Sequence, residues 1–362
     1  MHIISGDLWA GAEVQAYTLL KHLQTDVELC VILMNQGELS EKLLALGISP
    51  IIIPETTNSS FDIIRKLFNQ IRRFKPDVIH THRQKENILG SLANLACVPF
   101  NGRLIPSVRT AHGAPEFNPK GKQKIQAWLD QFVGRRLQKR VIAVSADLAQ
   151  QINAIYPSKH IIVIQNGVDV EALKKLAHPT EWRIAHPEKT HIGIIGRLEP
   201  VKRIDIFLDM AAILLQQHSE KNWHFHIIGD GKLKSFLGEQ AINLGISQSV
   251  TFHGHRKDIP SCIASLDAII MCSDHEGTPM TALETLALGK PLIAHHVGGL
   301  GEILVAYPSQ LVDEHSAAGY ESNLLQYMSK SYEKIELMNR YKAQENAMKS
   351  LHLYNQICHN HV

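Results

Sequence analysis

Several features that mark particular classes of protein are missing from this sequence. No apolar run approaches the roughly 18 residues of a membrane-spanning helix. The first residues, MHIISGDLWAG, lack the charged region and the long apolar core of a secretory signal. The five cysteines are scattered and never form a Cys-x-x-Cys pair, so neither a disulfide framework nor a zinc site is indicated. We therefore expect a cytoplasmic protein that does not span a membrane.

An excess of charge of one sign is missing as well. The 37 Lys and Arg residues nearly balance the 35 Asp and Glu residues, and the formal charge of +2 is far from that of a dedicated nucleic-acid-binding protein. With 44% hydrophobic and 20% charged residues, the composition is typical of a globular protein. The 362 residues suffice for two α/β domains of roughly 150 to 180 residues each.

Short apolar segments recur along the chain, separated by helical lengths of sequence. This alternation predicts strands of parallel, doubly wound sheets. In the first half the segments are 27–34, 49–54, 77–82, 103–110, 140–145 and 160–167. In the second half they are 191–197, 223–231, 249–254, 267–274 and 290–296.

The stretch 176–190 interrupts this rhythm. It contains two prolines and few consecutive apolar residues, which is typical of an interdomain linker. We expect Rossmann-like domains at 1–175 and 191–328, joined by this linker. A helical tail is predicted at 329–362, where every third residue is apolar or aromatic: Tyr332, Ile335, Met338 and Tyr341.

The segment 272–302 carries the most specific local pattern. Thr278 and Pro279 suit the N-cap and the first position of a helix, and Gly289 suits the position just beyond its end. A helix of about ten residues is therefore expected between them. Its N-terminus would offer unpaired N–H groups and a positive dipole to a phosphate.

Two glutamates accompany this helix. Glu276 lies just before it and Glu284 lies inside it, so that at ~1.5 Å per residue their carboxylates would be roughly 10 Å apart. This separation suits the two ends of a nucleotide sugar, with one carboxylate on sugar hydroxyls and the other on the ribose. The ordinary alternative is that both are solvated and that the neighbouring Gly298 and Gly299 only shape turns.

Arg197 and Lys202 follow the apolar segment that opens the second half. The carboxyl ends of parallel strands form the edge at which α/β sheets bind ligands, and two cations there are well placed for a diphosphate. The alternative is that both are ordinary surface cations.

Two residues of the first half give weaker signals. Gly11 lies just after the first strand, where a small residue lets the backbone approach a ligand. His112 follows the segment SVRTA, at the edge of the sheet where ligands bind. Turn glycines are common, however, and a lone histidine is usually structural or exposed.

The segment 120–141 has an apolar stripe at helical spacing, formed by Ile125, Trp128, Leu129, Phe132, Val133 and Leu137. Such a stripe is most often the core face of a helix. Basic residues flank it, at Lys120, Lys122, Lys124, Arg135 and Arg136. They leave open a second interpretation, peripheral contact with an anionic membrane.

The Gly-x-Gly in IIGDGK at 227–232 is a poor dinucleotide fingerprint, because the third glycine and a correctly spaced acidic residue are missing. We expect Gly229 and Gly231 to form turns. An NAD-dependent dehydrogenase is disfavoured for the same reason.

Together these segments resemble the retaining family-4 glycosyltransferases, also called glycosyl transferases group 1. The likeness covers about residues 1–305. It rests on the following segments: GAE at 11–13, His112, VSADL at 144–148, QNGVD at 165–169, GRLEPVKR at 196–203, EGTPMTALE at 276–284 and GKPLIAHHVGG at 289–299. Where the family often has paired glycines in its first loop, this chain has Ala10 before Gly11.

The resemblance implies a GT-B fold of two facing Rossmann-like domains, with the acceptor mostly in the first and the nucleotide-sugar donor mainly in the second. Arg197 and Lys202 would then hold the donor diphosphate, Glu284 the ribose and Glu276 the transferred sugar. The backbone of Gly277, Thr278, Pro279, Met280 and Thr281 would face sugar and phosphate. His112 would contact the donor sugar, and the Gly11 loop would approach it.

By the same resemblance the donor is a UDP- or GDP-sugar and the acceptor a glycan or a lipid-linked glycan of the cell envelope. No Asp-x-Asp pair is present, so we expect transfer without a metal, although Asp274 and Glu276 have a spacing that could hold a divalent ion. The alternatives are an epimerase or hydrolase of sugar nucleotides on the same fold and a non-catalytic protein that binds them.

Overall fold

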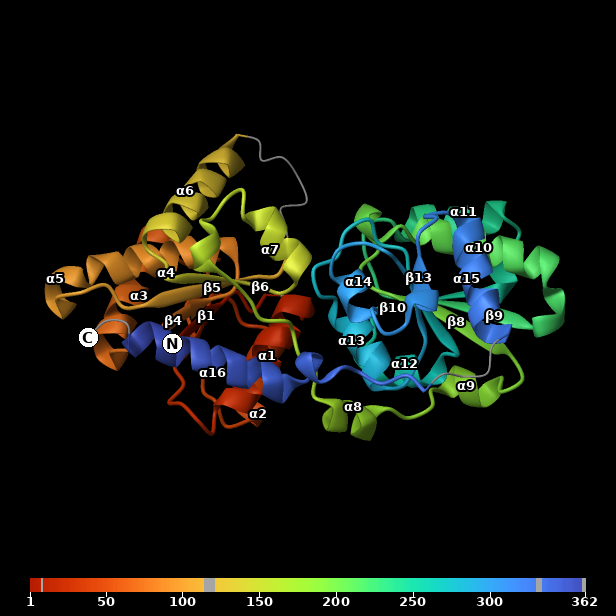
Figure 1. The fold of residues 1–362 in the computed structure, drawn as a ribbon, viewed down its shortest axis with the longest axis horizontal. Coiled ribbons are helices and arrows are strands. Elements are labelled where there is room, and N and C mark those ends of the chain that lie inside the picture. The colour runs from red at the N-terminus through yellow and green to blue at the C-terminus, as the bar shows by residue number, and fades with distance from the viewer. Residues whose placement is uncertain (8, 114–120, 330–333, 360–362) are drawn as a thin grey trace. The chain divides into compact units, whose positions relative to one another are not determined.

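The computed structural model describes residues 1–7, 9–113, 121–329 and 334–359. The chain forms two compact units, each an α/β sheet covered by helices (Figure 1). Unit 1 comprises Met1–Gly167 and Arg340–Val362, and unit 2 comprises Val168–Asn339. The predicted fold class, two Rossmann-like domains with parallel sheets, is confirmed.

The first unit contains a seven-stranded parallel sheet of order β3-β2-β1-β4-β5-β6-β7. Its strands are β1 (His2–Ile4), β2 (Val31–Leu33), β3 (Ile51–Ile52), β4 (Ile79–Thr81), β5 (Ser107–Ala111), β6 (Arg140–Ala143) and β7 (Ile161–Val163). Its helices are α1 (Gly11–Leu23), α2 (Glu38–Ala45), α3 (Ser60–Phe74), α4 (Gln84–Ala96), α5 (Val98–Asn101), α6 (Lys122–Arg136), α7 (Ala146–Ile152) and α16 (Ala343–His359).

Both faces of this sheet are buried, which explains why its strands are continuous apolar runs. Successive side chains point to opposite faces, so Ile3 packs with the cluster that includes Leu67 of α3, whereas Ile4 packs with the cluster that includes Leu20 of α1.

The second unit contains a six-stranded parallel sheet of order β10-β9-β8-β11-β12-β13. Its strands are β8 (Thr190–Ile195), β9 (Trp223–Ile228), β10 (Val250–Gly254), β11 (Ala268–Met271), β12 (Leu292–His295) and β13 (Leu311–Val312). Its helices are α8 (Val170–Leu176), α9 (Glu181–Ala185), α10 (Ile204–Gln217), α11 (Lys234–Asn243), α12 (Ile259–Ser265), α13 (Met280–Ala287), α14 (Gly299–Ile303) and α15 (Ala317–Ser329).

The predicted linker at 176–190 belongs to unit 2. The guanidinium of Arg183 in α9 donates to both carboxylate oxygens of Asp267, at 2.9 and 3.0 Å. The ring of Trp182 stacks on His226 of β9, with 4.0 Å between centroids. These contacts fix α9 against the sheet, and the division between the units falls earlier, between Gly167 and Val168.

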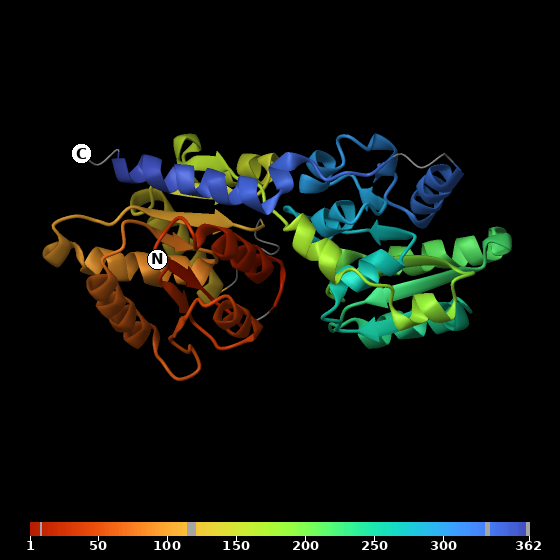
Figure 2. The same cartoon turned by 90° about the horizontal axis from the view of Figure 1, so that it is seen from below.

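The tail does not form one helix. Residues 334–338 are irregular, and Ile335 and Leu337 are buried on either side of the exposed Glu336, which is the alternation of an extended segment. Tyr332 lies outside the described residues. The chain then returns to unit 1 as α16, which lies along that unit in two views (Figures 1 and 2) and packs through Leu353 and Ile357.

The prediction that the apolar stripe of α6 faces the core is wrong for half of its side chains. Three large apolar ones are exposed: Ile125 (63%), Trp128 (62%) and Phe132 (46%). The helix instead turns Asp130 inward, where its carboxylate lies 2.5 Å from the guanidinium of Arg109 on β5. Gly134 also faces inward, and a Cβ there would lie only 2.3 Å from the ring of Tyr156. The inner face of α6 could not be predicted from its apolar residues, because it carries a charged residue and a glycine.

Replacing Asp130 by alanine is expected to lower the free energy of unfolding by ~3–5 kcal/mol, because the largely buried guanidinium of Arg109 would lose its carboxylate. Arg65→Ala is the control, since it removes an exposed ion pair with Asp62 that contributes little to stability. Urea unfolding followed by circular dichroism measures both. Equal, small losses would show that the Asp130 ion pair does not hold α6 in place.

Candidate functional site

The candidate site in unit 2 lies where the strand order reverses. From β8 the chain proceeds outward to β9 and β10, and then crosses to β11 on the other side of β8. In open α/β sheets the carboxyl ends of the two strands at such a switch point flank the ligand-binding crevice. Arg197 and Lys202 follow β8, and Glu276 follows β11, so these residues converge on this edge.

Lys202 and Glu276 are in direct contact. The ammonium Nζ of Lys202 lies 2.5 Å from Oε1 of Glu276, and the hydroxyl of Ser273 donates to the same oxygen at 2.6 Å. The Glu276 side chain is only 9% exposed, so the carboxylate is held in one orientation. The structure thus brings together two residues to which the family resemblance gives separate roles, one toward the diphosphate and one toward the sugar.

Two histidines support the loop that carries Glu276. Nε2 of His315 donates to the carbonyl oxygen of Cys272 at 2.7 Å, and Nδ1 of His295 donates to that of Ser273 at 3.0 Å. The two imidazoles stack with centroids 3.7 Å apart. Neither residue could be predicted from the sequence, because a histidine that donates to a backbone carbonyl has no sequence signature.

Helix α13 begins one residue later than predicted. Pro279 is its N-cap rather than its first helical residue, because a ψ of 128° is extended. Gly289, with a φ of +69°, follows the helix end as expected. The N–H groups of Met280 and Thr281 in the first turn have no preceding turn to bond to, so they are available to an anion. Gly277 and Thr278 lie in the loop before the helix.

Glu284 lies in the second turn of α13 and differs from Glu276 in its electrostatics. Its side chain is half-buried, and burial raises its pKa to about 7. Hydrogen bonds from ligand hydroxyls would favour its ionised form.

The loops around Glu276 require glycine at two close approaches. Gly298 has a φ of +53°, and a Cβ there would lie 2.0 Å from the carbonyl oxygen of Glu276. Gly229 has a φ of +143°, and a Cβ there would lie 1.8 Å from the carbonyl oxygen of Gly196. Gly229 is therefore a turn former, as predicted.

Asp274, the second carboxylate of the alternative metal pair, is also next to a cation. NH1 of Arg203 lies 3.3 Å from Oδ1 of Asp274, and NH2 of Arg203 lies 2.9 Å from Asp205. Asp274 and Glu276 thus each have a basic partner. This arrangement reduces the negative charge that would attract a divalent ion.

In unit 1 the strand order reverses between β1 and β4, which run parallel to each other. Gly11, the first residue of α1, is exposed after β1. NH2 of Arg83, which follows β4, lies 2.5 Å from the buried Glu13 in the first turn of α1, and its NH1 lies 3.4 Å from Asp7. Burial raises the pKa of the neighbouring Glu86 to about 7. The predicted loop at Gly11 is therefore tied to the β4–α4 loop by a charge cluster that the sequence did not reveal.

His112 follows β5, next to β4 in the sheet. Burial, together with the charges of Arg83 and Arg109, lowers its pKa to about 3, so the ring is neutral at physiological pH. Both ring nitrogens are buried without a hydrogen-bond partner among the described residues. One N–H and one lone pair are therefore available to a ligand.

Behind His112 lies a group of buried histidines, His2, His80 and His82, whose ring nitrogens lie within 4.8 Å of one another. His80 bonds to the hydroxyls of Tyr354 at 2.6 Å and Thr110 at 2.7 Å, and it stacks on His82 with an interplanar angle of 18°. Stacked rings do not aim their lone pairs at one point, and the nitrogens of His80 are already engaged. The group therefore forms a polar core of neutral imidazoles.

Comparisons with known proteins bear on both units. The family model "Glycosyl transferases group 1" matches residues 180–347, and "Glycosyltransferase Family 4" matches residues 9–172. The Escherichia coli UDP-Gal:alpha-D-GlcNAc-diphosphoundecaprenol alpha-1,3-galactosyltransferase is 26% identical over 79% of this chain and 75% of its own length. The Rhizobium meliloti (strain 1021) lipopolysaccharide core biosynthesis mannosyltransferase LpsB is 27% identical over 52% of this chain and 53% of its own length.

Solved structures extend the likeness to the whole fold. Anabaena Alr3699/HepE, in complex with UDP and glucose, has a TM-score of 0.76 and 20% identity, covering 99% of this chain and 98% of that one. At this identity the likeness shows the fold alone.

The raised pKa of Glu284 predicts a pH-dependent stability. The folded pKa of about 7 exceeds the ordinary value of 4.5, so the folded state binds the extra proton between these values and stability falls as pH rises through them, by about 3 kcal/mol. Glu284→Gln carries no charge, and it should gain stability over the wild type as pH rises from 5 to 8. Thermal melts across this range test the prediction, and a pH-independent difference would contradict it.

Proposed function

Because the chain belongs to the group 1 glycosyltransferases, we propose that it transfers a hexosyl group from a nucleotide sugar to an acceptor hydroxyl with retention of anomeric configuration. The GT-B fold implied by the resemblance is shared with the structural relatives. The observation that carries the proposal is the contact between Lys202 and Glu276 at the switch point of unit 2, beside the N-terminus of α13.

We propose that this edge of unit 2 binds the donor diphosphate. The Lys202 ammonium has three donors, of which one goes to Glu276, so two remain for phosphate oxygens. Arg197 is exposed in the same loop, and the first turn of α13 adds backbone N–H groups. These groups would stabilise the negative charge that develops on the leaving diphosphate. Glu276 would hold the transferred sugar and Glu284 the ribose.

Transfer would form a bond between the acceptor oxygen and the anomeric carbon as the bond to the diphosphate breaks. We propose that attack occurs on the face from which the diphosphate leaves, and that the acceptor proton passes to a departing phosphate oxygen. The neutral His112, with unpartnered ring nitrogens, would hydrogen-bond to the sugar. Basic groups would take the place of a metal, since Asp274 and Glu276 both have cationic partners.

The proposed donor and acceptor are based on the names of similar proteins. One is named for UDP-Gal and a diphosphoundecaprenol acceptor, and another structure contains UDP, so a UDP-sugar is favoured over a GDP-sugar. LpsB is named for lipopolysaccharide core synthesis. We therefore propose a glycan or lipid-linked acceptor in cell-envelope polysaccharide or glycolipid synthesis, on the cytoplasmic side of the membrane. No helix of the described residues is long and apolar enough to span a bilayer.

Lys202→Ala and Arg197→Ala should each reduce kcat by about 10²–10³, because each removes a cation from the site where charge develops. Lys189→Ala is the matched control, since Lys189 precedes β8 at the opposite edge of the same sheet. Initial rates of sugar transfer, with folding checked by circular dichroism, measure the effect. Retention of wild-type kcat in Lys202→Ala would contradict the diphosphate assignment.

The reaction is expected to proceed in EDTA and to give a product with the anomeric configuration of the donor. NMR of the product determines the configuration. Activity lost in EDTA and restored by magnesium would overturn metal independence. An inverted product, with transfer abolished but donor binding intact in His112→Ala, would instead make His112 a general base. Release of free sugar without acceptor would indicate a hydrolase.

A further inference from the structure

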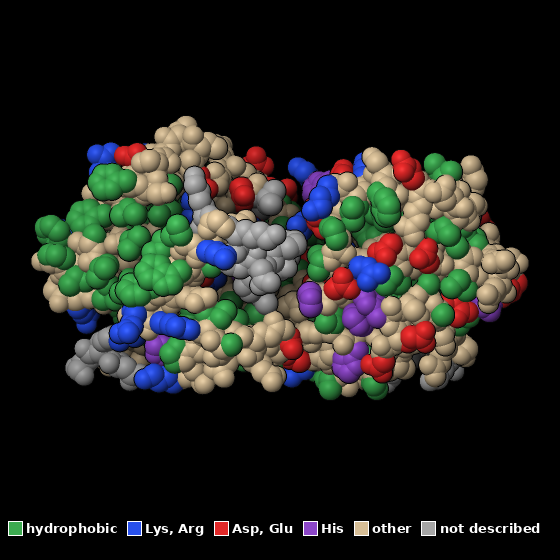
Figure 3. Space-filling model, turned by 90° about the horizontal axis from the view of Figure 1, so that it is seen from above, with side chains coloured by type: hydrophobic (Ala, Val, Ile, Leu, Met, Phe, Trp, Pro, Cys, Tyr) green, Lys and Arg blue, Asp and Glu red, His purple; other side chains and the backbone are tan. Residues whose placement is uncertain are grey.

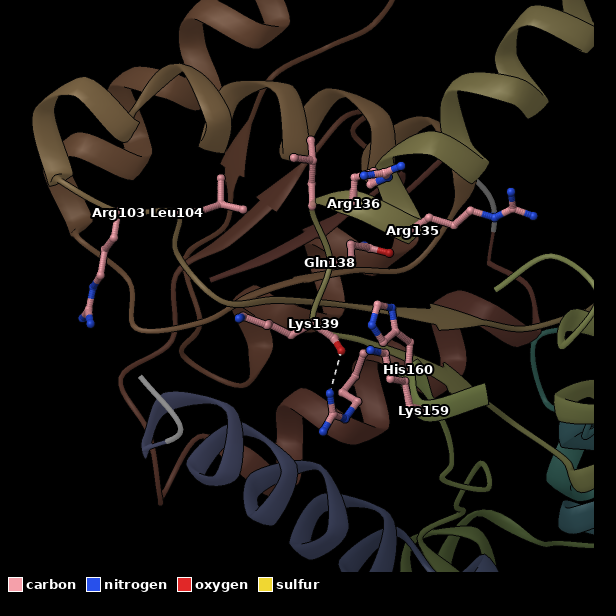
Figure 4. Close-up of a pocket in the computed structure, with 10 residues that line it drawn as sticks. Arg103, Leu104, Arg135, Arg136, Gln138, Lys139, Lys159 and His160 are labelled. Atoms are coloured by element: carbon pink, nitrogen blue, oxygen red, sulfur yellow. Dashed lines mark hydrogen bonds between the residues drawn. The ribbon is translucent and has the colours of Figure 1, made fainter. Parts of the chain in front are cut away.

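A cavity of about 530 Å³ in unit 1 is lined by basic side chains (Figure 4). Six are Lys or Arg: Arg103, Arg135, Arg136, Lys139, Arg140 and Lys159. His160 also lines the cavity, and burial together with the neighbouring cations lowers its pKa. None of the described residues that line the cavity is a carboxylate. In a chain whose formal charge is only +2, this is a strong local excess.

The cavity lies at the edge of the sheet opposite to His112. Arg103 precedes β5, Arg140 begins β6, and Lys159 lies just before β7, so these residues mark the amino ends of three neighbouring strands. His112 follows the carboxyl end of β5. The basic cavity is therefore separate from the candidate site residues of unit 1.

These cations are not neutralised by neighbouring carboxylates of the described residues. None of the six forms an ion pair within the part of the chain that the structure describes. Nε of Arg135 donates to the carbonyl oxygen of Ile155, and NH1 of Arg140 donates to that of Lys139 at 2.9 Å. Like charges this close repel one another, and a bound anion would relieve the repulsion.

The exposed face of α6 leads into this cavity. Ile125, Trp128 and Phe132 are spaced by three and four residues, so they share one face, and the rings of Trp128 and Phe132 stack with centroids 5.8 Å apart. The next turn of the same face carries Arg135 and Arg136, which line the cavity. Seen from the side on which α6 lies, hydrophobic side chains gather over this unit (Figure 3).

We propose that this face docks on a bilayer containing anionic phospholipids, with Ile125, Trp128 and Phe132 among the acyl chains and a lipid phosphate in the basic cavity. Aromatic side chains beside basic ones are typical of surfaces that rest in the membrane interface. A bilayer offers apolar chains and phosphates together, and so complements both parts of the face. A free phosphate or a nucleic acid would leave the exposed aromatic side chains uncovered. This interaction surface is independent of the transfer reaction.

Co-sedimentation of the full chain with phosphatidylcholine vesicles, with and without phosphatidylglycerol, tests the proposal. The wild type should bind only the anionic vesicles and should bind less at high salt. Trp128→Ser/Phe132→Ser and Arg136→Glu/Lys139→Glu should each weaken the apparent partition coefficient at least about tenfold. Phe236→Ser and Lys175→Glu are matched controls on exposed positions of unit 2, and they should bind as the wild type does.

Circular dichroism and thermal melts establish that the variants fold. No binding to phosphatidylglycerol vesicles at low salt, or full binding by either double variant, would overturn the proposal. So would light-scattering evidence that the wild type self-associates through Trp128 and Phe132, because the face would then be an interface between two copies of this chain.

Discussion

The candidate site depends on one ion pair, between Lys202 after β8 and Glu276 after β11. These two strands are neighbours, but the loops that follow them are more than seventy residues apart in the chain. The pair fixes the loop before α13, and Ser273 bonds to the same carboxylate. Direct contacts thereby hold a cation, a carboxylate and the N-terminus of a helix together at one edge of the sheet. Fixed charges of this kind need little reorganisation when a ligand develops charge.

Both units place histidine side chains behind their charged groups. In unit 2, His295 and His315 donate to consecutive carbonyls of the Glu276 loop. In unit 1, burial lowers the pKa of His80 and His82 well below the ordinary value, so both remain uncharged next to His112. A neutral imidazole can satisfy buried polar groups without adding a charge that would need its own partner.

Much of the fold could be predicted from the sequence, because strands buried on both faces are continuous apolar runs. Each of the eleven apolar segments overlaps a strand, whereas the two-residue β13 was missed because it is too short for a pattern. Gly289 could be predicted to follow the end of a helix, because the positive φ at that position favours glycine. Arg197 and Lys202 follow a strand end in the structure, as the sequence predicted, while their role in binding remains a proposal.

Other features depend on partners that are distant in the sequence. Asp130 is buried only because Arg109 on β5 neutralises it, so α6 presents to solvent the stripe that its periodicity assigned to the core. The predicted linker belongs to unit 2 because Arg183 forms an ion pair with Asp267. The tail packs on unit 1 because Leu353 and Ile357 join a hydrophobic cluster of that unit. The contact between Lys202 and Glu276 likewise follows from strand order, which local sequence does not contain.

A crystal structure of this protein with bound UDP tests the central claim most directly. The account predicts that the diphosphate lies within hydrogen-bond distance of Lys202 Nζ and of the backbone N–H groups of Met280 and Thr281, and that the ribose lies on Glu284. A diphosphate bound away from Lys202 and α13, or held through a metal ion on Asp274 and Glu276, would contradict it.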